Sequence, residues 1–212
     1  VLVYDRRGCS RSARPEPYVT SVVQHAGDAA ALIRALEAAP AIVIGRSYGG
    51  ETAVELALAH PELVRALVLL EAASVPLDEE AMAWAVDLHR RIEEAAAADP
   101  VSVAETFLRA VLGDEQWASF KPEVKRMFQD NGPAILAEFR GPWLEATEED
   151  LARIRVPTLL LMGRTSPEAL GRVTRRMAAA IPGSRLEVVG GGHFIDPGEP
   201  TVLEFVHSVL GS

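Results

Sequence analysis

The stretch AIVIGRSYGG, residues 41–50, gives the strongest indication of the fold and chemistry of this chain. Its first four residues are apolar, which is typical of a buried strand, and helical spacing follows over residues 51–59. Gly45, Ser47 and Gly49 form the pattern G-x-S-x-G. Between a strand and a helix, this pattern places the serine in a strained turn and presents its hydroxyl at the carboxyl end of the strand.

We therefore predict that Ser47 is a nucleophile; an ordinary strand–helix turn is the alternative. The backbone N–H of Tyr48 is predicted to stabilise a developing oxyanion. Serine is a weak nucleophile and needs a base, for which His193 is the candidate, because it follows an apolar run and three glycines that suit an exposed loop. A structural loop histidine is the alternative. The other histidines, at positions 25, 60, 89 and 207, lie within or at the ends of predicted helices.

The same alternation of elements continues along the chain. Apolar runs predict strands at 1–5, 41–45, 66–70, 158–162 and 186–189, and helical patterns occupy 21–38, 51–59, 168–181 and 200–210. Such alternation is typical of βαβ units and a mostly parallel sheet. The tract from 74 to 150 has no convincing strand and contains several helices interrupted by Pro and Gly. We predict an α/β core made of residues 1–73 and 151–212, with 74–150 as an inserted helical domain.

Aromatic residues in the insertion have two interpretations. They either line an apolar pocket or, as we favour, pack its helices together. These residues are Trp84, Trp117, Phe120, Phe128 and Trp143.

Composition excludes several classes of protein. The chain has 212 residues and a net charge of −9, which argues against nucleic-acid binding. A single cysteine excludes a disulfide framework, and the scattered histidines do not support a metal site. No apolar run is long enough to cross a bilayer. We expect no cofactor or metal, a small-molecule substrate, no nucleic-acid or membrane partner and, since no export signal is visible, a cytoplasmic location; the oligomeric state stays open.

Taken together, the motifs resemble the α/β-hydrolase superfamily. Residues 5–12 resemble its D-x-R-G-x-G-x-S segment, with Ser10 in place of the second glycine. Residues 45–49 match its nucleophile turn, 157–163 the strand before its usual acid, and 192–194 its histidine loop. The 74–150 insertion lies where these enzymes carry a helical cap.

The resemblance implies acyl transfer by the branch of the family that uses serine. We expect hydrolysis of a small, uncharged or apolar ester-like substrate through an acyl-enzyme. Similar scaffolds cleave lactones, amides and C–C bonds or make peracids, so these reactions stay open. The alternative is a catalytically inactive ligand-binding protein, or a truncated paralogue, on the same fold.

The third member of the triad departs from the usual family pattern. Ser166 occupies the position where an aspartate is usual, and a serine supplies no negative charge. Glu168 is close in sequence but lies at a predicted helix start, where acidic residues favour the helix dipole. Glu71 directly follows the apolar run 66–70, at the edge of the sheet where Ser47 is expected. We predict that Glu71 is the acid; a loop carboxylate without a role is the alternative.

In the family, three strands precede the segment that resembles residues 1–5. The third of these strands lies in the sheet between that segment and the strand that resembles residues 41–46. The loop after the third strand supplies a second oxyanion donor in the family, and nothing in this sequence matches that loop. We therefore expect a fragment or truncated paralogue that is poorly soluble and nearly inactive alone.

Overall fold

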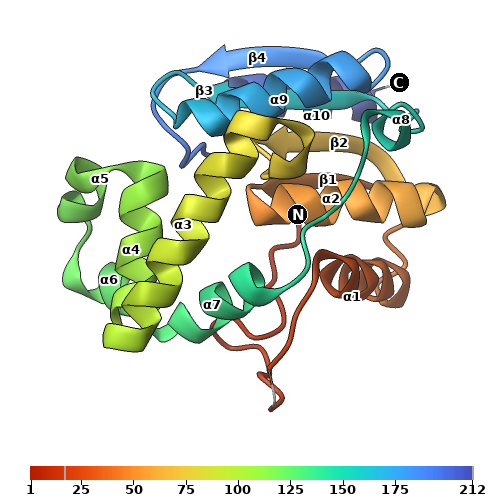
Figure 1. Cartoon of the computed structure of the whole chain (residues 1–212). Coiled ribbons are helices and arrows are strands. Elements are labelled where there is room, and N and C mark those ends of the chain that lie inside the picture. Colours follow the sequence, from red (N-terminus) through yellow and green to blue (C-terminus); the bar gives the residue numbers. More distant parts are fainter. Residues whose placement is uncertain (17, 212) are drawn as a thin grey trace. The chain divides into compact units, whose positions relative to one another are not determined.

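The computed structural model describes residues 1–16 and 18–211 (Figure 1). These residues form two compact units. One unit contains residues 1–21 and 83–142, and the other contains residues 22–82 and 143–212. No helix among the described residues is long and apolar enough to cross a membrane.

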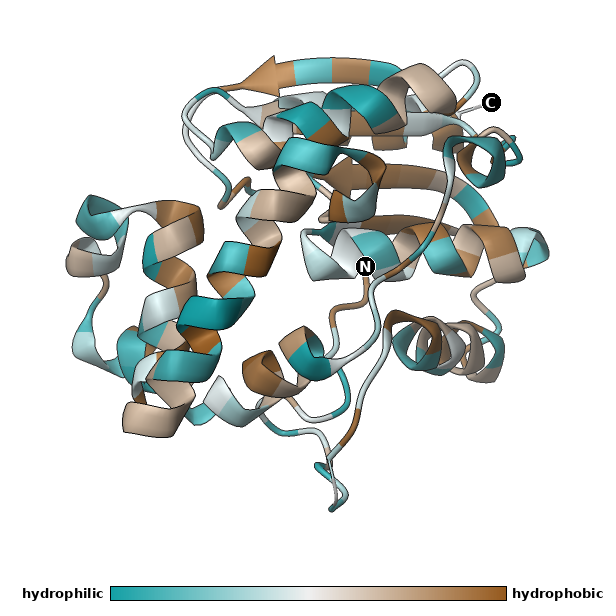
Figure 2. Cartoon of the chain, viewed as in Figure 1, coloured by the Kyte–Doolittle hydropathy of each residue, from teal (hydrophilic) through white to brown (hydrophobic). Residues whose placement is uncertain are grey.

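The second unit is built on a four-stranded parallel sheet with the strand order β1-β2-β3-β4. The strands are β1 (Ala41–Arg46), β2 (Val64–Leu70), β3 (Thr158–Gly163) and β4 (Arg185–Val189). The central strands β2 and β3 are almost wholly buried, which explains their continuous apolar sequences. Figure 2 shows β2 apolar along most of its length, whereas β4 alternates between apolar and polar residues. The predicted α/β fold with a parallel sheet is confirmed, as are four of the five predicted strands.

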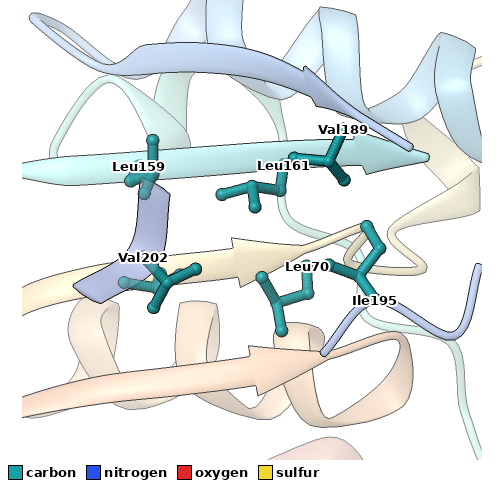
Figure 3. Packing of buried hydrophobic residues seen from close by; sticks show 7 residues of the cluster. Leu70, Leu159, Leu161, Val189, Ile195 and Val202 are labelled. Carbon is teal, nitrogen blue, oxygen red and sulfur yellow. The ribbon is translucent and has the colours of Figure 1, made fainter. Parts of the chain in front are cut away.

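Helices of the second unit cover both faces of this sheet. They are α1 (Val22–Ala35), α2 (Tyr48–Ala59), α8 (Glu148–Leu151), α9 (Glu168–Ala180) and α10 (Pro200–Leu210), with short 3₁₀ helices at Pro61–Leu63 and Val75–Leu77. On one face, Val202 of α10 packs in an apolar cluster with Leu70 and Leu161 (Figure 3). Met162 points to the opposite face, where it lies against Gly171 of α9.

Residues 1–5 do not form the predicted strand. They have no regular structure, and the side chains of Val1, Leu2 and Val3 are exposed. An extended segment becomes a stable strand only when a neighbour satisfies its backbone N–H and C=O groups. The described sheet consists of β1 to β4 paired with one another, and residues 1–5 join none of these strands. The apolar run therefore predicted the wrong structure.

The first unit is helical over residues 83–142. It contains most of α3 (Glu79–Ala98), then α4 (Ser102–Leu112), α5 (Asp114–Ser119), α6 (Pro122–Asp130) and α7 (Gly132–Arg140). The residues from 74 to 150 contain helices and no strand, as predicted. The boundaries of a cap at 74 and 150 stay a prediction. Residues 1–21, which were predicted to belong to the core, group with the helices in this unit.

The aromatic side chains of this unit pack its helices together. Trp117 is buried in a cluster with Leu88 and Ile92, and three of the other aromatics considered in the sequence pack against that cluster: Trp84, Phe120 and Phe128. The packing interpretation is confirmed for these four residues. Trp143 lies in the second unit.

The segment 5–12 folds as a tight loop in the first unit. Gly8 and Ser10 both have positive φ, +81° and 46°. Glycine adopts this conformation at little cost, which explains the glycine preference of the family motif at Ser10. The backbone N–H of Ser10 donates to Asn131 Oδ1 at 2.7 Å. The loop is thus held by a side chain at the start of α7.

Candidate active site

Ser47 occupies the strained turn that its sequence pattern predicts. Its φ and ψ are 52° and −122°, a conformation that L-residues rarely adopt. A Cβ atom at Gly45 would lie 2.2 Å from the carbonyl oxygen of Gly49, so only glycine fits there. The same limit applies at Gly50, where a Cβ would lie 2.6 Å from the Cβ of Ala72. The turn therefore depends on glycines that allow α2 to approach the ends of two strands.

Backbone hydrogen bonds tie Ser47 to the segment that carries Glu71. The N–H of Ser47 donates to the carbonyl of Leu70 at 3.1 Å, and its own carbonyl accepts from the N–H of Ala73 at 3.2 Å. Arg46 and Leu70 are paired in register, so Ser47 and Glu71 follow as the first residues beyond two neighbouring strands. Glu71 also has a positive φ, 48°. Two strained residues thus stand side by side at the carboxyl edge of the sheet.

Glu71 and His193 form a buried hydrogen-bonded pair. The distance from His193 Nδ1 to Glu71 Oε2 is 2.6 Å, and the exposed fractions of the two residues are 4% and 0%. A carboxylate oxygen only accepts, so Nδ1 carries the hydrogen, and Nε2 of a neutral imidazole is then free to accept a proton. This is the arrangement by which an acid fixes the tautomer of a catalytic histidine.

Two more donors hold the Glu71 carboxylate. The backbone N–H of Gly163 donates to Oε1 at 2.7 Å, and the hydroxyl of Ser166 donates to Oε2 at 2.9 Å. Burial of a carboxylate is costly unless its oxygens are hydrogen-bonded, and these donors with His193 supply three bonds. In the sequence, Ser166 stands out only because it replaces the usual acid, and no local pattern indicates that it or Gly163 binds Glu71.

Glu168 lies apart from this pair. It is in the first turn of α9, its side chain is 74% exposed, and it forms an ion pair with Arg175. The helix-terminus interpretation therefore describes its environment. Of the candidates for the acid, Glu71 contacts His193, whereas Glu168 does not.

Ser47 and His193 are not joined by a hydrogen bond among the described residues. In many enzymes, catalytic hydrogen bonds shorten and align only when substrate is bound. Tyr48 is the first residue of α2 and directly follows Ser47. Its ring packs edge-on against the buried His25 of α1, with ring centroids 5.6 Å apart. The catalytic roles of Ser47, His193, Glu71 and Tyr48 stay predictions.

The described residues contain no group of three or more His, Cys, Asp or Glu side chains placed to hold a metal ion. The other histidines lie where they were predicted. His25, His89 and His207 are in α1, α3 and α10, and His60 follows the last residue of α2.

Comparisons with known proteins identify the family. The sequence model of the α/β hydrolase fold matches residues 1–196. A protein of Pseudomonas savastanoi pv. phaseolicola, named "Putative carbamate hydrolase RutD", is 28% identical over 224 residues, which cover 98% of this chain and 83% of the relative. A protein of the same name from Azorhizobium caulinodans is 30% identical and covers 96% of this chain and 77% of its own length.

Solved structures give the same result. The structure described as "Est816 as an N-Acyl homoserine lactone degrading enzyme" aligns with a TM-score of 0.69 and 25% identity, over 98% of this chain and 80% of that one. A thermophilic esterase from Thermogutta terrifontis aligns with a TM-score of 0.68 and 22% identity, over 97% and 78%, and this likeness concerns the fold alone. The relatives matched by sequence are named as hydrolases, and this chain belongs to the α/β-hydrolase fold family.

Proposed function

We propose that this protein is a serine hydrolase that cleaves a small, uncharged or apolar ester-like substrate through an acyl-enzyme. The observation that carries the proposal is the buried contact of 2.6 Å between His193 and Glu71. It stands at the same edge of the sheet as the strained Ser47, since the backbone of Ser47 is bonded to Leu70, the residue before Glu71. The family membership supports the same reaction class.

The first half of the reaction forms the acyl-enzyme. Ser47 Oγ attacks the substrate carbonyl carbon while His193 Nε2 removes the hydroxyl proton. Glu71 stabilises the imidazolium that forms, through the hydrogen bond at Nδ1. The carbonyl oxygen becomes an oxyanion, and the backbone N–H of Tyr48 is the proposed donor to it. His193 then gives its proton to the leaving group as the bond between that group and the carbonyl carbon breaks.

The second half releases the acid. A water molecule attacks the acyl carbon, and His193 Nε2 takes one of its protons. The new oxyanion uses the same donor at Tyr48. When the bond to Ser47 Oγ breaks, His193 returns the proton to the serine, and the free carboxylic acid leaves. Two steps with small barriers thus replace one difficult hydrolysis.

Relatives indicate which carbonyl compounds to test. One set is named for carbamate hydrolysis, and one structural neighbour is described as degrading N-acyl homoserine lactones. Carbamates, lactones and simple esters all react by attack on a carbonyl carbon, so the same Ser47 chemistry serves each of them. We propose that the substrate belongs to this group of small carbonyl compounds.

Labelling with a fluorophosphonate probe tests the proposal. We expect the full-length protein to be labelled and its Ser47→Ala variant to be unlabelled. Ser10→Ala is a control at another serine with positive φ, and its labelling should match the wild type. Rates with p-nitrophenyl esters of increasing acyl length, an N-acyl homoserine lactone and a carbamate would then rank the substrates. A folded protein that is neither labelled nor active would support the inactive ligand-binding alternative instead.

A further inference from the structure

Arg46 is the last residue of β1 and directly precedes Ser47. Its side chain reaches the loop that carries His193. Nη1 of Arg46 donates to the carbonyl of Ile195 at 3.0 Å. Its guanidinium carbon lies 4.1 Å from the centre of the Phe194 ring. One side chain therefore links the residue next to Ser47 with the two residues that follow His193.

The position of the loop that carries His193 depends on contacts with other parts of the chain, such as those of Arg46. Residues 190–192 are glycines, so the chain before His193 is held by its neighbours rather than by its own side chains: the carbonyl of Gly191 accepts from the N–H of Thr165 at 3.0 Å. After His193, the Ile195 side chain is buried in the cluster that includes Leu70 (Figure 3). That packing holds the apolar side of the loop. Phe194 is 48% exposed, and the guanidinium of Arg46 stacks on its ring.

Burial of the charged Arg46 side chain carries a free-energy cost, because the guanidinium loses part of its hydration. Burial lowers the pKa of the guanidinium, and the nearby carboxylate of Asp196 opposes this effect. A half-buried cation is retained when its hydrogen bond and its ring contact compensate for lost hydration. The hydrogen bond, the ring contact and the opposing charge all come from three consecutive residues, 194–196.

We propose that Arg46 is a positioning residue, which clamps residues 194–196 to the end of β1 and so sets the location of His193 relative to Ser47. The proposal rests on the proposed function, because it assigns the clamp to the Ser47 and His193 pair. Arg46 contacts no reacting atom. It acts through the loop, and its removal should change how often His193 is correctly placed.

Kinetics with three variants test this role. Arg46→Met removes the charge and the donors at similar length, and we expect kcat to fall about 10- to 100-fold, as for a small misplacement of a catalytic group. KM should change by less than about threefold, since no substrate contact is removed. Arg46→Lys keeps a cation and one donor but not the flat stack on Phe194, so it should restore part of the loss. Arg65→Met, at an exposed arginine near the amino end of β2, is the matched control and should keep wild-type kcat.

A second measurement does not depend on turnover. Hydrogen exchange followed by mass spectrometry should show faster exchange of the peptide covering residues 190–199 in Arg46→Met, with wild-type exchange in β2 and β3. The downfield proton signal of His193 Nδ1–H, assigned with His193→Gln, should broaden in the same variant. If Arg46→Met does not fold, Phe194→Leu removes the ring alone and should give a smaller change of the same kind.

The outcomes separate the two proposals. Wild-type exchange and an unchanged His193 signal in Arg46→Met would overturn the clamp, whether or not the protein is an enzyme. A changed loop in a protein whose Ser47 is never labelled would instead overturn the proposed function. A fall in melting temperature with wild-type loop exchange and wild-type kcat would mean that Arg46 serves stability only, and would also overturn the clamp.

Discussion

The loops after β2 and β3 each carry a glutamate within a few residues of the strand end, but their environments are opposite. Glu71 directly follows β2, is 0% exposed and contacts His193. Glu168 begins α9 after β3, and its side chain is 74% exposed. Residue type and distance from the strand therefore do not decide which carboxylate can serve the histidine. The decisive factor is whether the side chain leaves the strand toward the interior or begins a helix in solvent.

The two loops are also complementary. The loop after β2 supplies the acceptor, and the loop after β3 supplies two donors, the N–H of Gly163 and the hydroxyl of Ser166. A Cβ at Gly163 would lie 2.6 Å from both the Gly192 carbonyl oxygen and Ser166 Oγ, so the donor loop is tightly packed against the histidine loop. The loop after β2 therefore carries the negative charge, and the loop after β3 supplies hydrogen bonds to that charge.

The largest expected effect on kcat comes from replacing Glu71 with its amide, and the same replacement at Glu168 is the control. Glu71→Gln should lower kcat by about 10³–10⁴-fold, because the amide no longer stabilises the imidazolium and favours the wrong tautomer. Glu168→Gln should keep wild-type kcat, since its ion pair with Arg175 is exposed. Steady-state kinetics on the best substrate, with circular dichroism to confirm folding, check both. If Glu168→Gln is the inactive variant, the acid belongs to the loop after β3.

A relocated acid should recover part of that loss. Ser166 Oγ lies 2.9 Å from the Glu71 oxygen that holds His193, so a carboxylate at 166 would reach nearly the same place. We expect Glu71→Gln combined with Ser166→Asp to be about 10-fold more active than Glu71→Gln alone. The matched control combines Glu71→Gln with Ser166→Asn, which has the same shape and no charge. Equal activity of the two double variants would show that the loop after β3 cannot replace the loop after β2.

Removal of the Ser166 hydroxyl alone should have a moderate effect. Ser166→Ala leaves Glu71 with two of its three partners, His193 and the N–H of Gly163. We expect the free energy of unfolding to fall by about 1–2 kcal/mol, and kcat to fall by no more than about tenfold. Urea unfolding and kinetics measure the two effects. Wild-type values of both would mean that this hydrogen bond contributes nothing to holding the acid.

The smallest effect concerns stability and comes from Asp78, at the far end of the segment after β2. Its carboxylate accepts from Arg172 Nε of α9 at 2.9 Å and from the N–H of Ala81 at 3.1 Å. The side-chain hydrogen bond from Arg172, first among several causes, lowers the pKa of Asp78 to about 2. Because the folded-state pKa is below the ordinary value of 3.8, the stabilisation is present above pH 4 and is lost as pH falls toward 2.

Asp78→Asn should therefore melt at a lower temperature than the wild type at pH 7, and the difference should shrink between pH 4 and pH 2. The control is Asp87→Asn, which removes an exposed partner of Arg90 on α3 and should change the melting temperature little. A difference between wild type and Asp78→Asn that stays constant down to pH 2 would contradict the assignment of the shift to this carboxylate.

Sequence patterns predicted the helices and strands, and the pairing of Glu71 with His193, better than they predicted the contacts around that pair. The apolar runs that became β1 to β4 pair with one another in one sheet, so composition is sufficient there. Residues 1–5 are also mostly apolar but join no strand of the described sheet, and no local pattern reveals whether a segment will find a neighbouring strand. The bonds from Gly163 to Glu71 and from Arg46 to Ile195 join residues 92 and 149 positions apart. Such contacts follow from the packing of the whole sheet and have no local signature.

The backbone of Ser47 has a consequence for experimental design and for neutral drift. With φ and ψ of 52° and −122°, glycine fits this position better than any L-residue. Both Ser47→Ala and Ser47→Gly remove the proposed nucleophile, yet the glycine variant should be more stable than the alanine variant by about 1 kcal/mol. Crystallographers who want an inactive protein loaded with substrate should therefore choose glycine. In a lineage released from selection for activity, mutations that relax this turn would spread on stability alone, and Ser47 would be among the first residues lost.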